Sequence, residues 1–154
     1  MAKPKATARN KMMDYLARRD HSVLEIRQKL KGKFEQTEID AAIDYGKSHG
    51  WLPNSAAAEL QLAEKAANEL HRRKKGALYI NNFLLKKGLP GVETDFSIEF
   101  NKALELVNNK LEITLECSRL ERVQLKAKIG RFLSSRGFEM NIIMSVVRKV
   151  LYEK

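Results

Sequence analysis

The side chains best suited to catalysis or metal binding are few in this chain of 154 residues, and they stand apart. None of the three histidines, His21, His49 and His71, has a partner at a metal-ligand spacing such as H-x₃-H. The single cysteine, Cys117, cannot form a disulfide within the chain, and no histidine stands near it in the sequence. We therefore expect no catalytic residue, no metal site and no bound cofactor, and we interpret Cys117 as a structural thiol.

The acidic residues Asp40 and Asp44 have a spacing that would suit a metal-dependent nuclease, because residues four apart share one face of a helix. A glycine-rich phosphate loop of the GxxxxGK[ST] type is absent from the sequence. We expect the two aspartates to be solvated or to pair with basic residues of the same chain.

Basic residues carry the strongest chemical signal in the sequence. The net charge of +10 favours an acidic partner such as nucleic acid, an anionic membrane or an acidic protein groove. The densest basic stretch is "HRRKKGALY", residues 71–79, which could contact phosphates while Tyr79 stacks on an unpaired base. The same charges would also suit the C-terminus of a helix, and Tyr79 could equally pack within the chain.

The elements that position these residues read as helices almost throughout. In "RRDHSVLEIRQKL", residues 18–30, Ser22 and Glu25 predict a capping box, with Ile26 and Leu30 on one face of the helix that follows. A second helix is expected from Thr37 to near Gly50. A third should begin after Asn54 or Ser55 and end before Gly76. Strand-like alternation is absent, so the sequence predicts an all-α fold.

An internal repeat organises these helices. Isoleucine is followed by leucine four residues later at Ile26, Ile80 and Ile129. The second and third copies then carry Gly88 and Gly137, which we expect to close a helix in the left-handed conformation. The first copy lacks a glycine at this offset, so its turn must differ. We predict three three-helix repeats at 1–52, 53–98 and 99–154, stacked into an elongated, curved solenoid.

Charge alternates with the same period. Residues 1–33, 71–90 and 117–154 carry net charges of +7, +6 and +6, whereas residues 34–70 and 91–116 carry −5 and −4. Each basic block contains the middle helix of one repeat. Stacked repeats could align these blocks into one basic stripe, although each block could also be an ordinary solvated surface.

Other readings of the charge are less favourable. A helix-turn-helix reader of duplex DNA would place the helix at 38–48 in the major groove, and its acidic residues would be repelled by phosphate. No apolar segment approaches the length of a membrane helix, and no apolar stretch follows the basic N-terminus as in a signal peptide. A basic helix at a membrane surface stays a minor alternative. We expect a cytoplasmic protein.

The sequence resembles the RecX family, the bacterial regulators of the RecA recombinase, from about residue 10 to residue 152. The resemblance rests on "YLARRDHSVLEIRQKL", "HRRKKGALYINNFLLKKGL" and "KIGRFLSSRGF", in this order and at this spacing. It differs in the first turn, in Pro53 and Asn54 after "GWL", and between residues 91 and 118, where the helix junctions are hard to place.

The resemblance implies a non-enzymatic regulator of recombination, DNA repair and the SOS response. Such a regulator binds the groove of the RecA–single-stranded-DNA filament and limits its extension, ATP hydrolysis, strand exchange and co-protease activity. We expect a monomer, with direct binding to single- or double-stranded DNA left open. A non-specific DNA-binding protein and a helical adaptor for an acidic protein remain alternatives. The candidate contact residues come from the basic blocks: Arg18, Arg19, Arg27, Lys29, Lys31, Arg72, Arg73, Lys74, Lys75, Tyr79, Lys86, Lys87, Lys128, Arg131 and Arg136.

Overall fold

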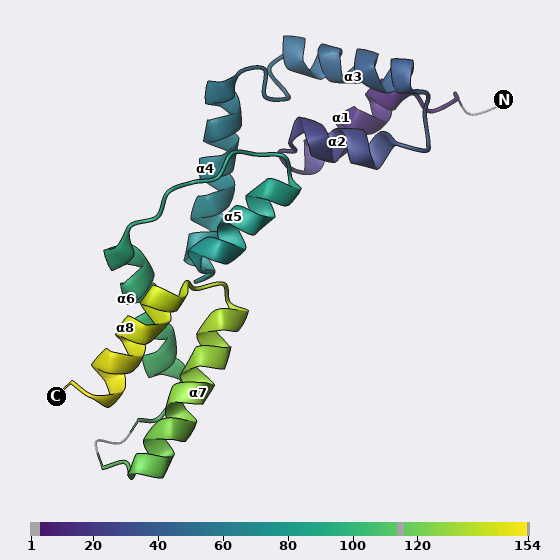
Figure 1. The fold of residues 1–154 in the computed structure, drawn as a ribbon. Helices are drawn as coiled ribbons and strands as arrows, with labels where there is room; N and C mark the ends of the chain where they lie inside the picture. The colour runs from purple at the N-terminus through teal and green to yellow at the C-terminus, as the bar shows by residue number, and fades with distance from the viewer. Residues whose placement is uncertain (1–3, 114–115, 154) are drawn as a thin grey trace. The chain divides into compact units, whose positions relative to one another are not determined.

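Helices account for nearly all the regular structure of the chain. The computed structural model describes residues 4–113 and 116–153, which contain eight α-helices and no β-strand (Figure 1). Their bounds are α1 Ala8–Arg18, α2 Val23–Leu30, α3 Gln36–Ser48, α4 Ala56–Arg72, α5 Ala77–Lys86, α6 Phe96–Lys110, α7 Arg119–Ser135 and α8 Met140–Leu151. The expected all-α class is confirmed.

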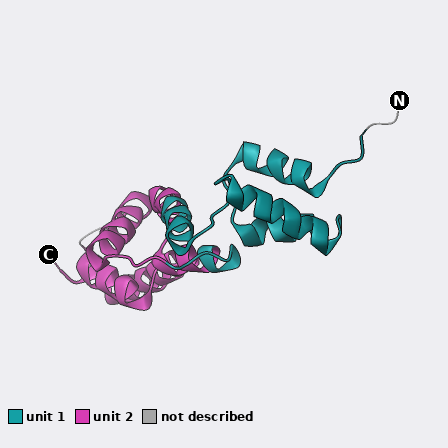
Figure 2. Ribbon diagram, turned by 90° about the horizontal axis from the view of Figure 1, so that it is seen from above, with its two compact units in different colours: residues 1–66, 84–91 teal, residues 67–83, 92–154 magenta. Residues whose placement is uncertain are grey.

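The helices form two compact units, coloured separately in Figure 2. Unit 1 comprises residues 1–66 and 84–91, and unit 2 comprises residues 67–83 and 92–154. Helices α4 and α5 therefore contribute residues to both units. In unit 1, α1, α2 and α3 enclose a core that includes Met12, Ile26, Leu30 and Ile43. In unit 2, α6, α7 and α8 enclose a second core, whose buried residues include Val107, Ile129, Leu133, Phe138 and Val146.

The predicted capping box of α2 is present. The Ser22 hydroxyl accepts a hydrogen bond from the Glu25 N–H, and the Glu25 carboxylate accepts one from the Ser22 N–H. Ser55 caps α4 by accepting a hydrogen bond from the Ala58 N–H, as one of the two expected residues. Helix α3 begins at Gln36, one residue before the predicted Thr37.

The repeat glycines close their helices as expected. Gly88 and Gly137 have φ values of 68° and 86°, and each follows its repeat leucine by four residues. The first turn does differ, because Gly32, with φ of 78°, follows Leu30 by only two residues. Helix α4 ends at Arg72, before Gly76 as expected, and Lys74 takes the left-handed conformation after it, with φ of 58°.

Gly76 is required for another reason, which is the close approach of two turns within unit 2. Its N–H donates to the Arg136 carbonyl, and the Leu78 N–H donates to the Gly137 carbonyl, both at 2.9 Å. A Cβ atom at Gly76 would lie 2.4 Å from the Gly137 backbone. The turn between α4 and α5 is thus joined to the turn between α7 and α8.

The region between residues 91 and 118 now has definite helix limits. Asp95 caps α6 by accepting a hydrogen bond from the Ser97 N–H at 2.8 Å, so the helix begins directly after it. The predicted repeat limit at residue 98 falls inside this helix, and residues 53–98 contain α4, α5 and an extended stretch. Pro90 and Gly91 explain why this stretch is not helical. The repeat limits remain a prediction.

Candidate partner-binding surface

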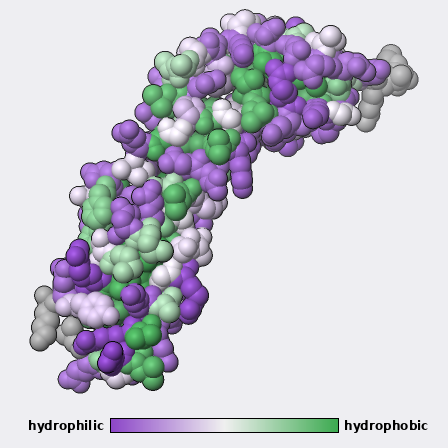
Figure 3. Space-filling model, in the orientation of Figure 1, coloured by the Kyte–Doolittle hydropathy of each residue, from purple (hydrophilic) through white to green (hydrophobic). Residues whose placement is uncertain are grey.

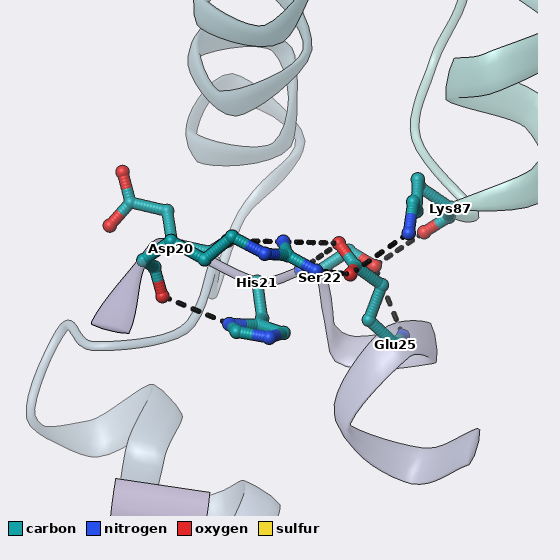
Figure 4. A network of polar contacts seen from close by, with 6 residues as sticks. Asp20, His21, Ser22, Glu25 and Lys87 are labelled. Atoms are coloured by element: carbon teal, nitrogen blue, oxygen red, sulfur yellow. Dashed lines mark hydrogen bonds and ion pairs between the residues drawn. The ribbon is translucent and has the colours of Figure 1, made fainter. Parts of the chain in front are cut away.

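A buried carboxylate in unit 1 organises two of the candidate basic residues (Figure 4). Glu25 accepts hydrogen bonds from Arg19 Nη2 at 2.7 Å and from Lys87 Nζ at 3.1 Å. The Glu25 side chain is 7% exposed, and the two cations approach it from the segment before α2 and from the end of α5. Arg19 and Lys87 therefore stabilise unit 1 in addition to any contact with a partner.

The ionised form of Glu25 is strongly favoured. Burial acts to raise the pKa of Glu25, but hydrogen bonds from Arg19, from Lys87 and from the Ser22 N–H outweigh it and lower the pKa to about 2. Because this pKa lies below the ordinary value of 4.5, the stabilisation is complete above pH 4.5 and is lost as the pH falls towards 2.

Ser22 links the same network to the end of α5. Its hydroxyl donates to the Lys87 carbonyl at 2.5 Å while it accepts from the Glu25 N–H. The neighbouring His21 is buried, and its Nδ1 lies 2.9 Å from the Arg19 carbonyl. The stretch at residues 18–30 is thus partly a structural junction and only partly a free basic surface.

Two further candidates in unit 1 have partners of their own. Arg27 forms an ion pair with Asp40 at 2.6 Å, and Asp40 also accepts a hydrogen bond from Gln36. These contacts confirm the expectation that Asp40 would pair within the chain. Lys29 lies with its Nζ atom 4.7 Å from the centre of the Tyr15 ring. Among residues 4–113 and 116–153, no group of three or more His, Cys, Asp or Glu residues could hold a metal ion.

The basic cluster of unit 2 surrounds the turn at residues 73–76. Arg136 donates from Nη2 to the Arg73 carbonyl at 2.6 Å and from Nε to the Lys74 carbonyl at 3.3 Å. Lys74 pairs with Glu105 at 2.6 Å, and the Lys75 ammonium lies 4.5 Å from the centre of the Tyr79 ring. The guanidinium of Arg136 therefore satisfies two carbonyls of the turn that follows α4.

The remaining candidates divide between a surface pair and free cations. Arg72 pairs with Glu69 on the surface of α4. Six candidates are exposed, and their side chains form no hydrogen bond, ion pair or ring contact with another residue of the described segments: Arg18, Lys31, Arg73, Lys86, Lys128 and Arg131. No acidic side chain of the described residues forms an ion pair with any of these six. Figure 3 shows hydrophilic residues over much of the visible surface of both units.

Sequence reasoning missed a second basic group in unit 1, which we term the Tyr15 cluster. The Tyr15 ring has Lys29 over it and Lys11 Nζ at 5.6 Å from its centre, and Lys33 Nζ donates to the Tyr15 hydroxyl at 3.4 Å. Lys11 precedes Tyr15 by four residues within α1, so helical spacing could have indicated this half, whereas Lys33 lies in the turn after α2. The contact between the halves depends on how α1 and α2 pack.

An exposed aromatic group lies at and just after the C-terminus of α3, also in unit 1. Trp51 is 43% exposed, and its ring centre lies 4.8 Å from that of His49 and 5.6 Å from that of Tyr45. The Arg9 guanidinium covers the Tyr45 ring at 3.7 Å. An exposed indole can stack on an unpaired base.

Comparison with known proteins places this arrangement in a family. Residues 8–45 match the family model described as RecX, first three-helix domain, and residues 98–147 match RecX, third three-helix domain. The regulatory protein RecX of Pseudomonas fluorescens (strain SBW25) is 32% identical over 142 residues, covering 88% of this chain and 86% of that protein. The chain belongs to the RecX family.

Other RecX relatives agree with this assignment. The regulatory protein RecX of Clostridioides difficile (strain 630) is 28% identical over 152 residues, covering 94% of this chain and 68% of that protein. The crystal structure of RecX from Lactobacillus salivarius matches with a TM-score of 0.74 and 18% identity, covering 93% of this chain and 94% of that one. At this identity the likeness concerns the fold, and it supports the all-α repeat architecture.

The RecX segments carry most of the candidate residues. The first matched segment contains Arg18, Arg19, Arg27, Lys29 and Lys31, and the second contains Lys128, Arg131 and Arg136. The basic run at 72–75 lies between the two segments. RecX proteins are regulatory proteins by name, so membership gives this chain a regulatory role. Within the described residues, no helix is both long and apolar enough to cross a bilayer.

Proposed function

We propose that this chain binds the RecA–single-stranded-DNA filament and limits its extension, ATP hydrolysis, strand exchange and co-protease activity. It acts by binding and catalyses no reaction. The observation that carries this proposal is the match to the regulatory protein RecX of Pseudomonas fluorescens over 88% of the chain. We further propose that it works as a monomer in the cytoplasm, where the filament forms.

The free cations of the two units make the contact with the filament. Arg18, Lys31 and Lys86 belong to unit 1, whereas Arg73, Lys128 and Arg131 belong to unit 2. A filament that contains single-stranded DNA offers phosphates as well as acidic protein side chains, and both attract unpaired lysine and arginine. The paired residues Arg19, Arg27, Lys74, Lys87 and Arg136 hold the units in shape and contribute less to binding.

Direct binding of single-stranded DNA is a second candidate function, favoured by the Tyr15 cluster. Three lysines surround one tyrosine there without an acidic residue in contact with the ring or its hydroxyl among the described residues. Lysine side chains can follow a phosphate backbone while exposed aromatic rings, such as that of Trp51, stack on bases. Such binding would weaken steeply with salt.

Charge reversal of free cations tests the main proposal. Arg18→Glu with Lys31→Glu alters unit 1, and Arg73→Glu with Lys128→Glu alters unit 2; the matched control, Lys47→Glu with Arg148→Glu, changes the net charge equally outside the candidate set. The measurement is the ATPase activity of RecA on single-stranded DNA as each variant is titrated. We expect each test pair to weaken inhibition about tenfold and the control to retain it.

Two results would contradict this assignment of the surface. Equal loss in the control would mean that only net charge matters, and full inhibition by a variant carrying all four reversals would mean that the contact lies elsewhere. Naked single-stranded DNA separates the second candidate. Lys11→Glu with Lys33→Glu should abolish DNA binding, and if it leaves ATPase inhibition intact, filament binding and DNA binding are separate functions.

A further inference from the structure

Helix α7 has a second stripe, made of apolar and small residues, that its own unit leaves uncovered. Its core-facing residues, Ile129 and Leu133, are fully buried. A different set of positions, separated alternately by three and four residues, stays exposed or half-exposed: Leu120, Val123, Ala127, Gly130 and Ser134. Leu120 and Val123 are 68% and 60% exposed. Alternating spacing of three and four is the seam of a coiled coil, so this face of α7 is patterned to receive another helix.

Helix α8 turns the stripe into a groove. The hollow between α7 and α8 has a volume of about 770 Å³ and is lined on the α8 side by Met140 and Met144, with Ile143 and Val147 below them. Met140 is 67% exposed and Met144 is 45% exposed. Methionine side chains adapt their shape to an apolar partner, which suits a docking groove.

Gly130 indicates that a partner from outside the chain comes close to the backbone of α7. Glycine within a helix lowers helix stability by about 1 kcal/mol relative to alanine. A Cβ atom placed at Gly130 would have no neighbour within 4 Å, so packing within the described structure does not require glycine. A partner helix crossing the stripe at this position would require it, because two helix backbones come closest where side chains are smallest.

The charges beside the stripe identify the kind of partner. Lys126 directly precedes Ala127 and Arg131 directly follows Gly130, so the two occupy the flanking positions of a coiled coil, where charges choose the partner. Both line the groove, no acidic residue lines it, and neither cation has a partner within the described part of the chain. If a second copy of the chain filled the groove, its lysine and arginine would face those of the first copy. This repulsion between like charges disfavours self-association.

We propose that the groove between α7 and α8 binds an amphipathic helix of another protein, with aliphatic residues in its seam and glutamate or aspartate at its flanks. The aliphatic residues lie on Val123, Met140 and Met144, the acids pair with Lys126 and Arg131, and the backbone of the incoming helix passes over Gly130. The groove shares Arg131 with the filament contact proposed above, but its apolar lining and Lys126 lie outside that contact, and the proposal holds whether or not the chain acts on RecA.

A pair of synthetic peptides tests the site on the full-length chain. Both are about 21 residues long with leucine in the seam; one has glutamate at the flanking positions and the other has lysine. Fluorescence anisotropy should show the glutamate peptide binding about tenfold more tightly than the lysine peptide. Lys126→Glu with Arg131→Glu should reverse this preference. Failure of the glutamate peptide to bind, or an unchanged preference in the double variant, would overturn the proposal.

Gly130→Gln separates binding from folding. Glutamine is a better helix former than glycine, so this variant should melt at a higher temperature while binding the glutamate peptide about tenfold more weakly. Unchanged binding would overturn the proposal. Two other results would also overturn it, because each assigns the groove to a different occupant. One is dimerisation of the unmodified chain in sedimentation experiments that Gly130→Gln abolishes. The other is binding of anionic phosphatidylglycerol vesicles without binding of the glutamate peptide.

Discussion

Each compact unit buries a glutamate that serves the N-terminus of a helix, but the two glutamates reach that terminus in different ways. Glu25 in unit 1 lies on α2 itself and accepts from the Ser22 N–H, three residues away. Glu99 in unit 2 lies on α6 and accepts from the Ala77 N–H of α5 at 2.9 Å, 22 residues away in sequence. The same requirement for an acceptor is met locally in one unit and by tertiary packing in the other.

The cations that balance the two glutamates differ as well. Glu25 faces Arg19, whose side chain is half exposed, and Lys87. Glu99 faces Lys102, which is 7% exposed and also donates to the Lys75 carbonyl at 2.7 Å and lies 2.8 Å from His71 Nδ1. Burial lowers the pKa of Lys102, although its hydrogen bond to Glu99 opposes that shift. The Glu99–Lys102 pair of unit 2 is less exposed to solvent than the pairs that Glu25 forms in unit 1. Breaking it should therefore lower the free energy of unfolding more.

The largest effect we expect comes from Lys102→Met. It leaves Glu99 buried without its cation and should lower the free energy of unfolding by about 3–5 kcal/mol. Urea denaturation measures the loss. Glu99→Gln combined with Lys102→Met should recover part of it, because an amide tolerates burial better than an unpaired carboxylate. A loss below about 1 kcal/mol in the single variant would show that the pair contributes as little as a surface pair.

Turn glycines extend the comparison to backbone packing. At Gly137 in unit 2, a Cβ atom would lie 2.4 Å from Tyr79 Cβ, whereas at Gly32 in unit 1 it would meet nothing within 4 Å. Both residues have positive φ. Gly137→Ala should therefore cost about 2–4 kcal/mol, from backbone strain and crowding together, and Gly32→Ala about 1–2 kcal/mol from strain alone. Thermal denaturation compares the two, and equal losses would mean that the turn in unit 2 relaxes freely.

The capping serines give a smaller difference. Ser22 and Ser118 both complete capping boxes, but among the described residues only the buried Ser22 also donates to a carbonyl distant in sequence, that of Lys87 just after α5. Ser22→Ala should cost about 1–2 kcal/mol and Ser118→Ala about 0.5–1 kcal/mol. Denaturant midpoints of the two variants, measured at equal slope, decide the order. A larger loss at Ser118 would contradict the role of the contact between α2 and α5.

The smallest effect concerns pH. Burial lowers the pKa of His21 in unit 1 and of His71 in unit 2 below 6.5, and the positive charge of Lys102 adds to the shift at His71. Because the unfolded chain then binds more protons, the free energy of unfolding should decrease as the pH falls through 6.5. Denaturation between about pH 7.5 and pH 5.5 should show this slope, and His21→Gln with His71→Gln should flatten it.

Local chemistry explains which of these features the sequence could predict. The capping box at Ser22 and Glu25 and the left-handed Gly137 depend on residues a few positions apart, so both were predicted and both are present. The pairing of Glu99 with the N-terminus of α5 depends on the packing of α6, which no local pattern encodes. The close approach at Gly76 could not be predicted either, because the turn that crowds it lies about 60 residues away in the sequence.

The candidate contact residues show the same division. Composition and charge periodicity indicated where cations would be dense, and Arg18, Lys31 and Lys128 are indeed exposed and unpaired among the described residues. The pattern could not indicate that Arg136 would satisfy backbone carbonyls or that Arg19 would pair with Glu25, because each contact requires tertiary structure. Charge density alone therefore overstates the free basic surface.

The contact between the turns at Gly76 and Gly137 has a consequence for the order of folding during synthesis. Unit 1 has all of its residues once position 91 has been made, whereas the turn after α4 must wait for position 137 and unit 2 for the last residues of the chain. Bacterial and eukaryotic ribosomes add about 5–20 residues per second, so the remaining 63 residues take roughly 3–13 s. During that interval the nascent chain carries a complete first unit attached to an apolar segment, Ala77–Phe83, that still lacks its partner helices.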